Sequence, residues 1–152
     1  MTDMPIYMHF LFSFFATVGF SIFLNAPKSA LLPAGVTGAV GWSLYFVLFN
    51  LSSNSIFANF IAAAVVSLLS EILARKLKHP AILFVIPGII PLVPGLGMYN
   101  TMLYLVQNHF DLAISTGADT LFVSGAIALG VLIITSLSRT LTILQLKQKA
   151  AK

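Results

Sequence analysis

Residues 94–101, Pro-Gly-Leu-Gly-Met-Tyr-Asn-Thr, place a helix-breaking proline beside side chains that can form hydrogen bonds. They end a longer apolar stretch, residues 79–101, with prolines at 80, 87, 91 and 94 and glycines at 88, 95 and 97. A proline inside a helix removes a backbone donor and clashes with the preceding turn, so this stretch cannot form one regular helix. A helix that restarts after a loose turn, from about Met98 to Gln107, would present free N–H groups and the positive end of its dipole.

Half-helices with such free N-termini bind anionic groups at the midplane of secondary transporters. We therefore predict a substrate site at the break, made by a group of proline, glycine and polar positions: Pro91, Pro94, Gly95, Tyr99, Asn100 and Thr101. The alternative is a packing kink that neighbouring helices resolve, because proline and glycine are common in membrane helices.

Two other side chains are candidates for coupling transport to protons. Glu71 is a carboxylate within an apolar span, and such groups are functional candidates by default; Arg75, four residues later, offers the alternative of an interfacial ion pair. His9 can titrate near neutral pH. The chain has no cysteine, no set of His, Asp and Glu at ligand spacing, and no catalytic or phosphate-binding motif. We therefore expect no metal, no cofactor and no enzymatic activity.

The composition decides the class of protein that positions these residues. Of 152 residues, 59% are hydrophobic and 8% are charged, whereas soluble domains have about 25% charged residues. The sequence thus predicts a polytopic membrane protein that forms a single domain, residues 1–152, within the lipid bilayer. The formal charge of +4 does not indicate nucleic-acid binding, because the basic residues lie beside the ends of apolar spans.

The expected fold is all-α, with about five transmembrane helices of which the fourth is broken. The spans cover about residues 5–24, 30–51, 56–74, 80–109 and 120–141, with an acidic loop at 111–119 and a basic cytoplasmic tail at 142–152. Small residues in the second and fifth spans allow helix backbones to approach closely; the helix-packing candidates are Gly35, Gly38, Gly41, Gly125 and Gly130.

The charges also predict an orientation in the cell membrane. Lys28, the cluster at residues 75–78 and the tail should be cytoplasmic, whereas the Ser/Asn turn at 52–55 and the loop at 111–119 should be external. These assignments alternate without conflict only if the fourth element crosses the membrane once. We therefore predict an external N-terminus and a cytoplasmic C-terminus.

Several motifs carry a family resemblance. The run Ile90-Pro91-Leu-Val-Pro94-Gly95 followed by Tyr99 resembles the C-terminal half of threonine/serine exporters, as do the His79-Pro80 entry and residues 23–27, Phe-Leu-Asn-Ala-Pro. The stretch Gly38-x-x-Gly41-Trp42 matches as well. The similarity covers about residues 10 to 140. In split members of the family, such as the two-component succinate exporter, this half is a separate small subunit; because the sequence contains only this half, it looks like the split form.

The resemblance implies an exporter subunit for small anionic or zwitterionic substrates, either threonine and serine or dicarboxylates such as succinate. It also implies a second five-helix membrane subunit as partner. An odd number of crossings agrees with this, because two fused halves would then be inverted relative to each other. The alternative function is a membrane scaffold without transport activity, since faces of small residues suit assembly equally well.

Overall fold

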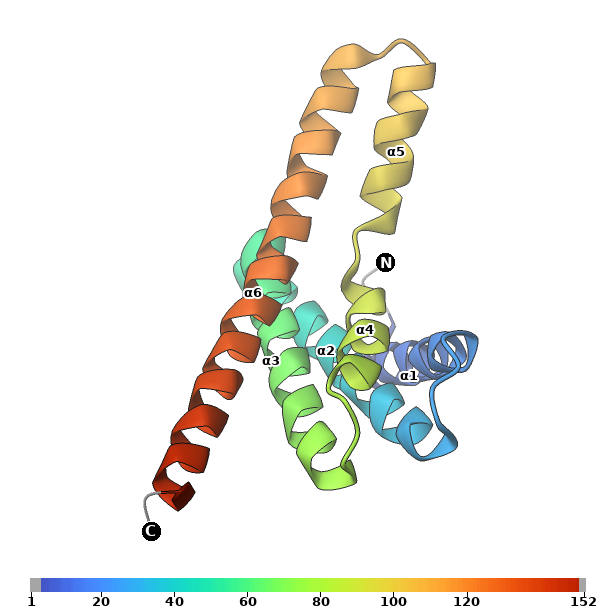
Figure 1. The fold of residues 1–152 in the computed structure, drawn as a ribbon. Helices are drawn as coiled ribbons and strands as arrows, with labels where there is room; N and C mark the ends of the chain where they lie inside the picture. Colours follow the sequence, from blue (N-terminus) through green and yellow to red (C-terminus); the bar gives the residue numbers. More distant parts are fainter. Residues whose placement is uncertain (1–3, 151–152) are drawn as a thin grey trace.

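The computed structural model describes residues 4–150, with side chains described up to residue 140, and within these residues the fold is all α-helical, as predicted (Figure 1). Three long helices come first: α1 (Ile6–Phe23), α2 (Lys28–Ser52) and α3 (Ser55–Leu77). The broken element follows as α4 (Ile82–Ile89), the 3-10 turn η1 (Ile90–Leu92) and α5 (Gly95–Val106). The chain ends in α6 (Phe110–Ala150).

Small residues let α1, α2 and α3 pack closely. A Cβ atom on Gly35 would lie 2.6 Å from the Val18 side chain of α1, and one on Gly38 would overlap Thr17. On the other face of α2, a Cβ atom on Gly41 would overlap Val66 of α3. The buried hydroxyl of Thr17 donates a hydrogen bond to the Ser13 carbonyl within α1, so its polar atom needs no partner on α2.

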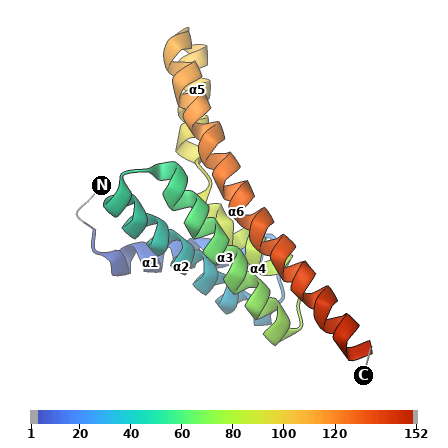
Figure 2. The same ribbon diagram turned by 90° about the vertical axis from the view of Figure 1, so that its left-hand side faces the viewer.

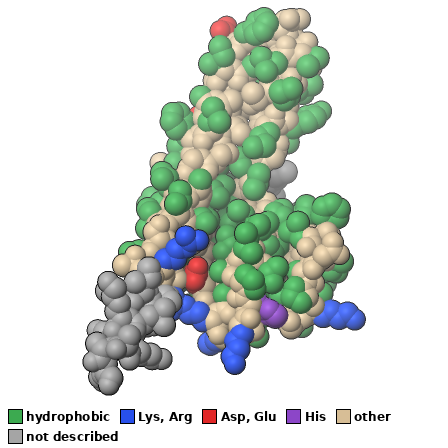
Figure 3. Space-filling model, in the orientation of Figure 1, with side chains coloured by type: hydrophobic (Ala, Val, Ile, Leu, Met, Phe, Trp, Pro, Cys, Tyr) green, Lys and Arg blue, Asp and Glu red, His purple; other side chains and the backbone are tan. Residues whose placement is uncertain are grey.

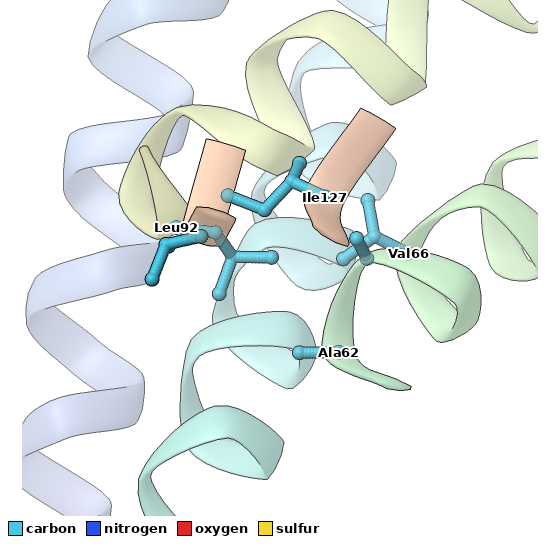
Figure 4. Close-up of a cluster of buried hydrophobic side chains, with 6 residues drawn as sticks. Ala62, Val66, Leu92 and Ile127 are labelled. Carbon is cyan, nitrogen blue, oxygen red and sulfur yellow. The ribbon is translucent and has the colours of Figure 1, made fainter. Parts of the chain in front are cut away.

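The break occurs where the sequence predicted it. Pro87 lies within α4, Pro91 lies within η1, and Pro94 immediately precedes α5. The axes before and after the break differ in direction by 53°. Leu92 of η1 joins a buried apolar cluster at the centre of the bundle with Ala62 and Val66 of α3 and Ile127 of α6 (Figure 4). The break is therefore anchored in the core.

Two predicted boundaries were wrong. Residues 111–119, expected as an acidic loop before a span at 120–141, are helical and form the start of α6. The segment contains no proline, and Asp111 in the first turn interacts favourably with the helix dipole. Helix α5 starts at Gly95 rather than at Met98. Pro94 directly precedes the helix, where a backbone N–H would have no acceptor within the helix, so its missing N–H costs nothing there.

Four helices, through Thr140 of α6, are long and apolar enough to cross a membrane, and a fifth crossing follows if the bent pair is one span. With 41 residues, α6 is about 60 Å long at 1.5 Å per residue, so it and α5 extend well beyond the α2–α3 turn (Figure 2). Hydrophobic side chains are spread over the whole length of the face in view, and Lys and Arg gather at the end where α3 finishes (Figure 3). The basic residues of the predicted tail, residues 142–152, are not among the residues whose side chains the structure describes.

Candidate functional site

A polar cavity of about 610 Å³ lies beside the break. Three parts of the chain surround it: the α2–α3 turn, the start of α5 and the N-terminal half of α6. Its polar lining consists of Ser52, Ser53, Asn54, Ser55, Thr116, Asp119 and Thr120, together with Pro94 and Gly97 from the broken element. The volume is within the range typical of small-molecule sites.

The N-terminus of α5 opens toward this cavity. No side chain caps the helix. The Gly95 amide donates to the Val93 carbonyl at 2.8 Å and the Met98 amide to the Pro94 carbonyl at 3.1 Å, whereas the amides of Leu96 and Gly97 have no acceptor among the described residues. Unpaired amides and the helix dipole give this end of α5 a partial positive charge.

Helix α6 supplies the opposite charge. Asp119 is exposed and lines the cavity. The next residue is Thr120, whose hydroxyl donates at 2.7 Å to the carbonyl of Thr116, one turn earlier in the helix. A Cβ atom on Gly97 would overlap this hydroxyl, so the glycine allows α5 to approach α6 at the wall of the cavity. The site thus combines amide donors, a carboxylate and hydroxyl groups.

The residues predicted at the break do not all meet in this cavity. Pro94 lines it, but Pro91 lines a different cavity together with His9 and Trp42. The Thr101 hydroxyl donates to the Gly97 carbonyl at 2.7 Å within α5, and Tyr99 is 63% exposed. Two further candidates are outside the cavity lining as well: Gly95 and Asn100.

Sequence reasoning missed Asp119 and the turn at residues 52–55 as site residues. A signal was present, because both segments were assigned to the external side of the membrane. Residues that share one membrane face can converge on one cavity when the helices that carry them are neighbours. The contact of α6 with both α3 and α5 brings them together.

Glu71 is part of a polar cluster between α3 and α6. The Ser138 hydroxyl donates to the Glu71 carboxylate at 2.7 Å. The Arg75 guanidinium donates to the Ser138 hydroxyl at 2.8 Å and to its carbonyl at 3.3 Å. The sequence pointed to Glu71 and Arg75 as neighbours on one helix; the structure adds Ser138, which links both to the C-terminal half of α6.

The packing candidates differ in their surroundings. A Cβ atom on Gly130 would lie 2.6 Å from the Phe60 carbonyl oxygen of α3, so the two backbones are in direct contact there. At Gly125 nothing lies within 4 Å of the added atom. Among the described residues, no group of three or more His, Cys, Asp or Glu side chains could hold a metal ion.

Long apolar helices around a broken central element, with a polar cavity at the break, define this chain as a polytopic α-helical membrane protein. The profile described as "Threonine/Serine exporter, ThrE" matches residues 9–137. The chain therefore belongs to the threonine/serine exporter family. The family comprises exporters and is not an enzyme class, in agreement with the expectation from the sequence.

Two relatives differ in length from this chain. An uncharacterized protein of Haemophilus influenzae is 33% identical over 129 residues, which are 79% of this chain and 43% of that protein. The threonine/serine exporter of Corynebacterium glutamicum is 29% identical over 114 residues, 75% of this chain and 23% of that protein. This chain thus spans less than half the length of either relative. No solved structure matches it.

Proposed function

We propose that this chain is a membrane subunit of a secondary-active exporter of small hydroxy-amino acids, and that it binds the substrate at the cavity beside the break. The observation that carries this proposal is the presence, in one cavity, of the uncapped N-terminus of α5 and the carboxylate of Asp119. A site with both signs of charge suits a zwitterion. The family membership supports export as the activity.

Each part of an amino acid has a partner in this arrangement. The substrate carboxylate would accept hydrogen bonds from the amides of Leu96 and Gly97, because the positive end of α5 lies there. The ammonium group would lie at Asp119. The side-chain hydroxyl would bond to hydroxyl groups of the lining, such as Thr116.

The same lining disfavours a dicarboxylate, which the resemblance left open as substrate. A second carboxylate in this cavity would lie near Asp119, and like charges at close range repel each other. The other titratable groups of the described chain are absent from the lining, so no Lys, Arg or His offsets that charge. We therefore propose threonine and serine, rather than succinate, as the substrates.

The exposure of α5 supports the existence of a partner subunit. No residue of α5 is buried, and α5 packs chiefly against α6. This chain covers 43% of one relative and 23% of another, so a second segment or subunit would supply the remainder. We propose that this second five-helix part covers α5 and completes the cavity, and that transport proceeds as the two parts move against each other.

We further propose an external N-terminus and a cytoplasmic C-terminus. The basic residues of the α3 end support this orientation. Because the chain has no cysteine, single cysteines at Ser53 and Gln148 can be labelled without background. Labelling of Ser53 from outside and of Gln148 only after permeabilisation is the expected result; labelling of both from one side would contradict it.

Glu71 is our proposed proton-coupling residue. Proton binding at its carboxylate would remove the charge that accepts from Ser138 and so weaken the contact of α3 with α6. Glu71→Gln retains an acceptor and cannot carry a proton. Efflux by this variant should lose its dependence on the proton gradient while the amount of assembled protein is unchanged. An unaltered gradient dependence would assign Glu71 to packing alone.

The direct test of the proposed function is efflux from preloaded cells. Cells that lack this gene and its partner should release threonine and serine several times more slowly than cells in which both genes are restored. Succinate efflux measured in parallel serves as the comparison. Unchanged threonine efflux after the deletion would reject the proposal. A change in succinate efflux alone would reject the choice of a zwitterionic amino acid as the substrate.

A further inference from the structure

A second cavity, mostly apolar, lies on another side of the break. A cavity of about 300 Å³ is lined by Pro91 of η1, Trp42 of α2 and four residues of α1: His9, Phe12, Ser13 and Ala16. Only three residue steps separate Pro91 from Pro94, which lines the cavity at α5, so the two cavities are within about 10 Å along the chain. Both therefore depend on the same short segment.

Two aromatic residues of α2 fix the imidazole of His9. The Trp42 indole N–H lies 3.3 Å from His9 Nδ1, and the Phe46 ring stacks on the imidazole with centroids 4.0 Å apart. An indole nitrogen can only donate. His9 Nδ1 is therefore the acceptor, and in the neutral ring the proton is on Nε2.

This Nε2–H group has no partner. It is buried, and no acceptor for it exists among the described residues. A buried donor without an acceptor is unfavourable by about 1–3 kcal/mol, so most such groups in proteins have a functional or structural explanation. The groups that face His9 from α2 and η1 are Trp42, Phe46 and Pro91, none of which offers a side-chain acceptor to Nε2.

We infer that His9 is a hydrogen-bond donor for the substrate carboxylate, with Nε2–H as the donor and Trp42 as the positioning residue that directs it. The inference rests on the proposed function. Because Nε2 is covered in this conformation, the substrate reaches it only in a second arrangement of the helices, as in a transporter with alternating access. His9 and the cavity at α5 then serve the same substrate in different conformations.

Two substitutions of His9 distinguish the roles of its two ring nitrogens. His9→Gln places an amide donor where Nε2 lies and cannot carry a proton. His9→Asn reaches only the position of Nδ1, so it can accept from Trp42 but leaves the break without a donor. We expect threonine efflux to fall about tenfold in His9→Asn and to remain within about twofold in His9→Gln, since a hydrogen bond to a charged group contributes this much. A proton-carrying role for His9 predicts loss in both.

Trp42 fluorescence gives a readout that does not depend on transport. Trp42 is the single tryptophan of the chain, and the difference in emission between wild type and Trp42→Phe isolates it when a partner subunit is present. In lipid nanodiscs, added L-threonine should change this emission in a saturable manner for wild type and His9→Gln. The emission of His9→Asn and His9→Phe should not respond.

The outcomes distinguish this inference from the proposed function. Wild-type threonine efflux with an unresponsive Trp42, or equal efflux in His9→Asn and wild type, would overturn the role of His9 and leave the exporter intact. A Trp42 response to succinate but not to threonine would support a carboxylate-binding His9 and overturn the choice of a zwitterion. Loss of folded protein in His9→Asn is controlled by His9→Gln, which makes the same change from a ring to an amide.

Discussion

The inner bundle and the outer hairpin of this molecule are built differently. In the bundle of α1–α4 and the adjoining α3–α6 contact, glycine, alanine, serine and threonine are buried where backbones meet. In the hairpin of α5 and the first half of α6, apolar side chains such as Leu96, Val106 and Leu121 are more than two-thirds exposed. The helices of the bundle meet through buried small residues, whereas no residue of α5 is buried, and the hairpin lines part of the polar cavity.

This difference in packing bears on how far each region can move. Close backbone contacts allow little adjustment, because protein interiors are packed as densely as organic crystals. A helix held by one neighbour can move against that neighbour at much smaller cost in contacts. Pro91 and Pro94, three residues apart, each line one of the two cavities, and we expect the hairpin to move relative to the bundle about this segment.

The largest effect should come from the backbone contact between α3 and α6. Gly130→Ala would press a methyl group against the Phe60 carbonyl, 2.6 Å away, and backbone atoms cannot yield as a side chain can. We expect a loss of stability of about 1–3 kcal/mol and less folded protein in the membrane, measured by thermal unfolding in detergent. Gly125→Ala, on the same helix with nothing within 4 Å, is the matched control. Equal melting temperatures for the two variants would show that the α3–α6 contact is not rigid.

Asp119 tests the hairpin by function rather than stability. Asp119→Asn removes the charge proposed to bind the substrate ammonium and keeps the shape, so threonine efflux should fall about tenfold with unchanged expression. Asp111→Asn, an exposed carboxylate at the far end of α6 that is absent from the cavity, should transport normally. If the two variants behave alike, the cavity at α5 is not the substrate site.

Local sequence signals predicted the bundle well, and the reason is physical. Pro27 and Asn54 are followed immediately by helices, and prolines at 87, 91 and 94 mark the break, because these residues act on the backbone next to them. The helix at residues 111–119 was missed because its polar residues suggested a loop. Polar residues disfavour burial in lipid, but they do not prevent a segment from forming a helix. The convergence of Asp119 with the turn at 52–55 depends on long-range packing of α6, which no local pattern encodes.

Ser138 tests the inner end of the same long helix. Ser138→Ala removes the hydroxyl that joins Glu71 and Arg75 across the α3–α6 contact. A hydrogen bond to a charged group contributes about 1.5 kcal/mol or more, and partial exposure should keep the loss near that value. Hydrogen exchange should become faster near the C-terminal end of α3 and around Ser138 of α6, and stay unchanged at the break. Ser136→Ala, exposed on the same helix, is the control. Identical exchange in both variants would show that the cluster of Glu71, Arg75 and Ser138 does not stabilise the α3–α6 contact.

The smallest effect separates two glycines within the first turn of α5. At Gly95 nothing lies within 4 Å of an added Cβ atom, whereas at Gly97 it would overlap the Thr120 hydroxyl. Gly95→Ala should raise stability by at most about 1 kcal/mol, because alanine restricts the unfolded chain, and should leave efflux unchanged if only backbone amides bind the substrate. Gly97→Ala should lower efflux severalfold by displacing Thr120 at the cavity wall, with folding retained because a side chain rather than backbone must move. The contrast is measured as efflux per assembled subunit. Loss of efflux in Gly95→Ala alone would place the substrate against that residue, as the sequence first suggested, and would move the site away from the wall formed by α6.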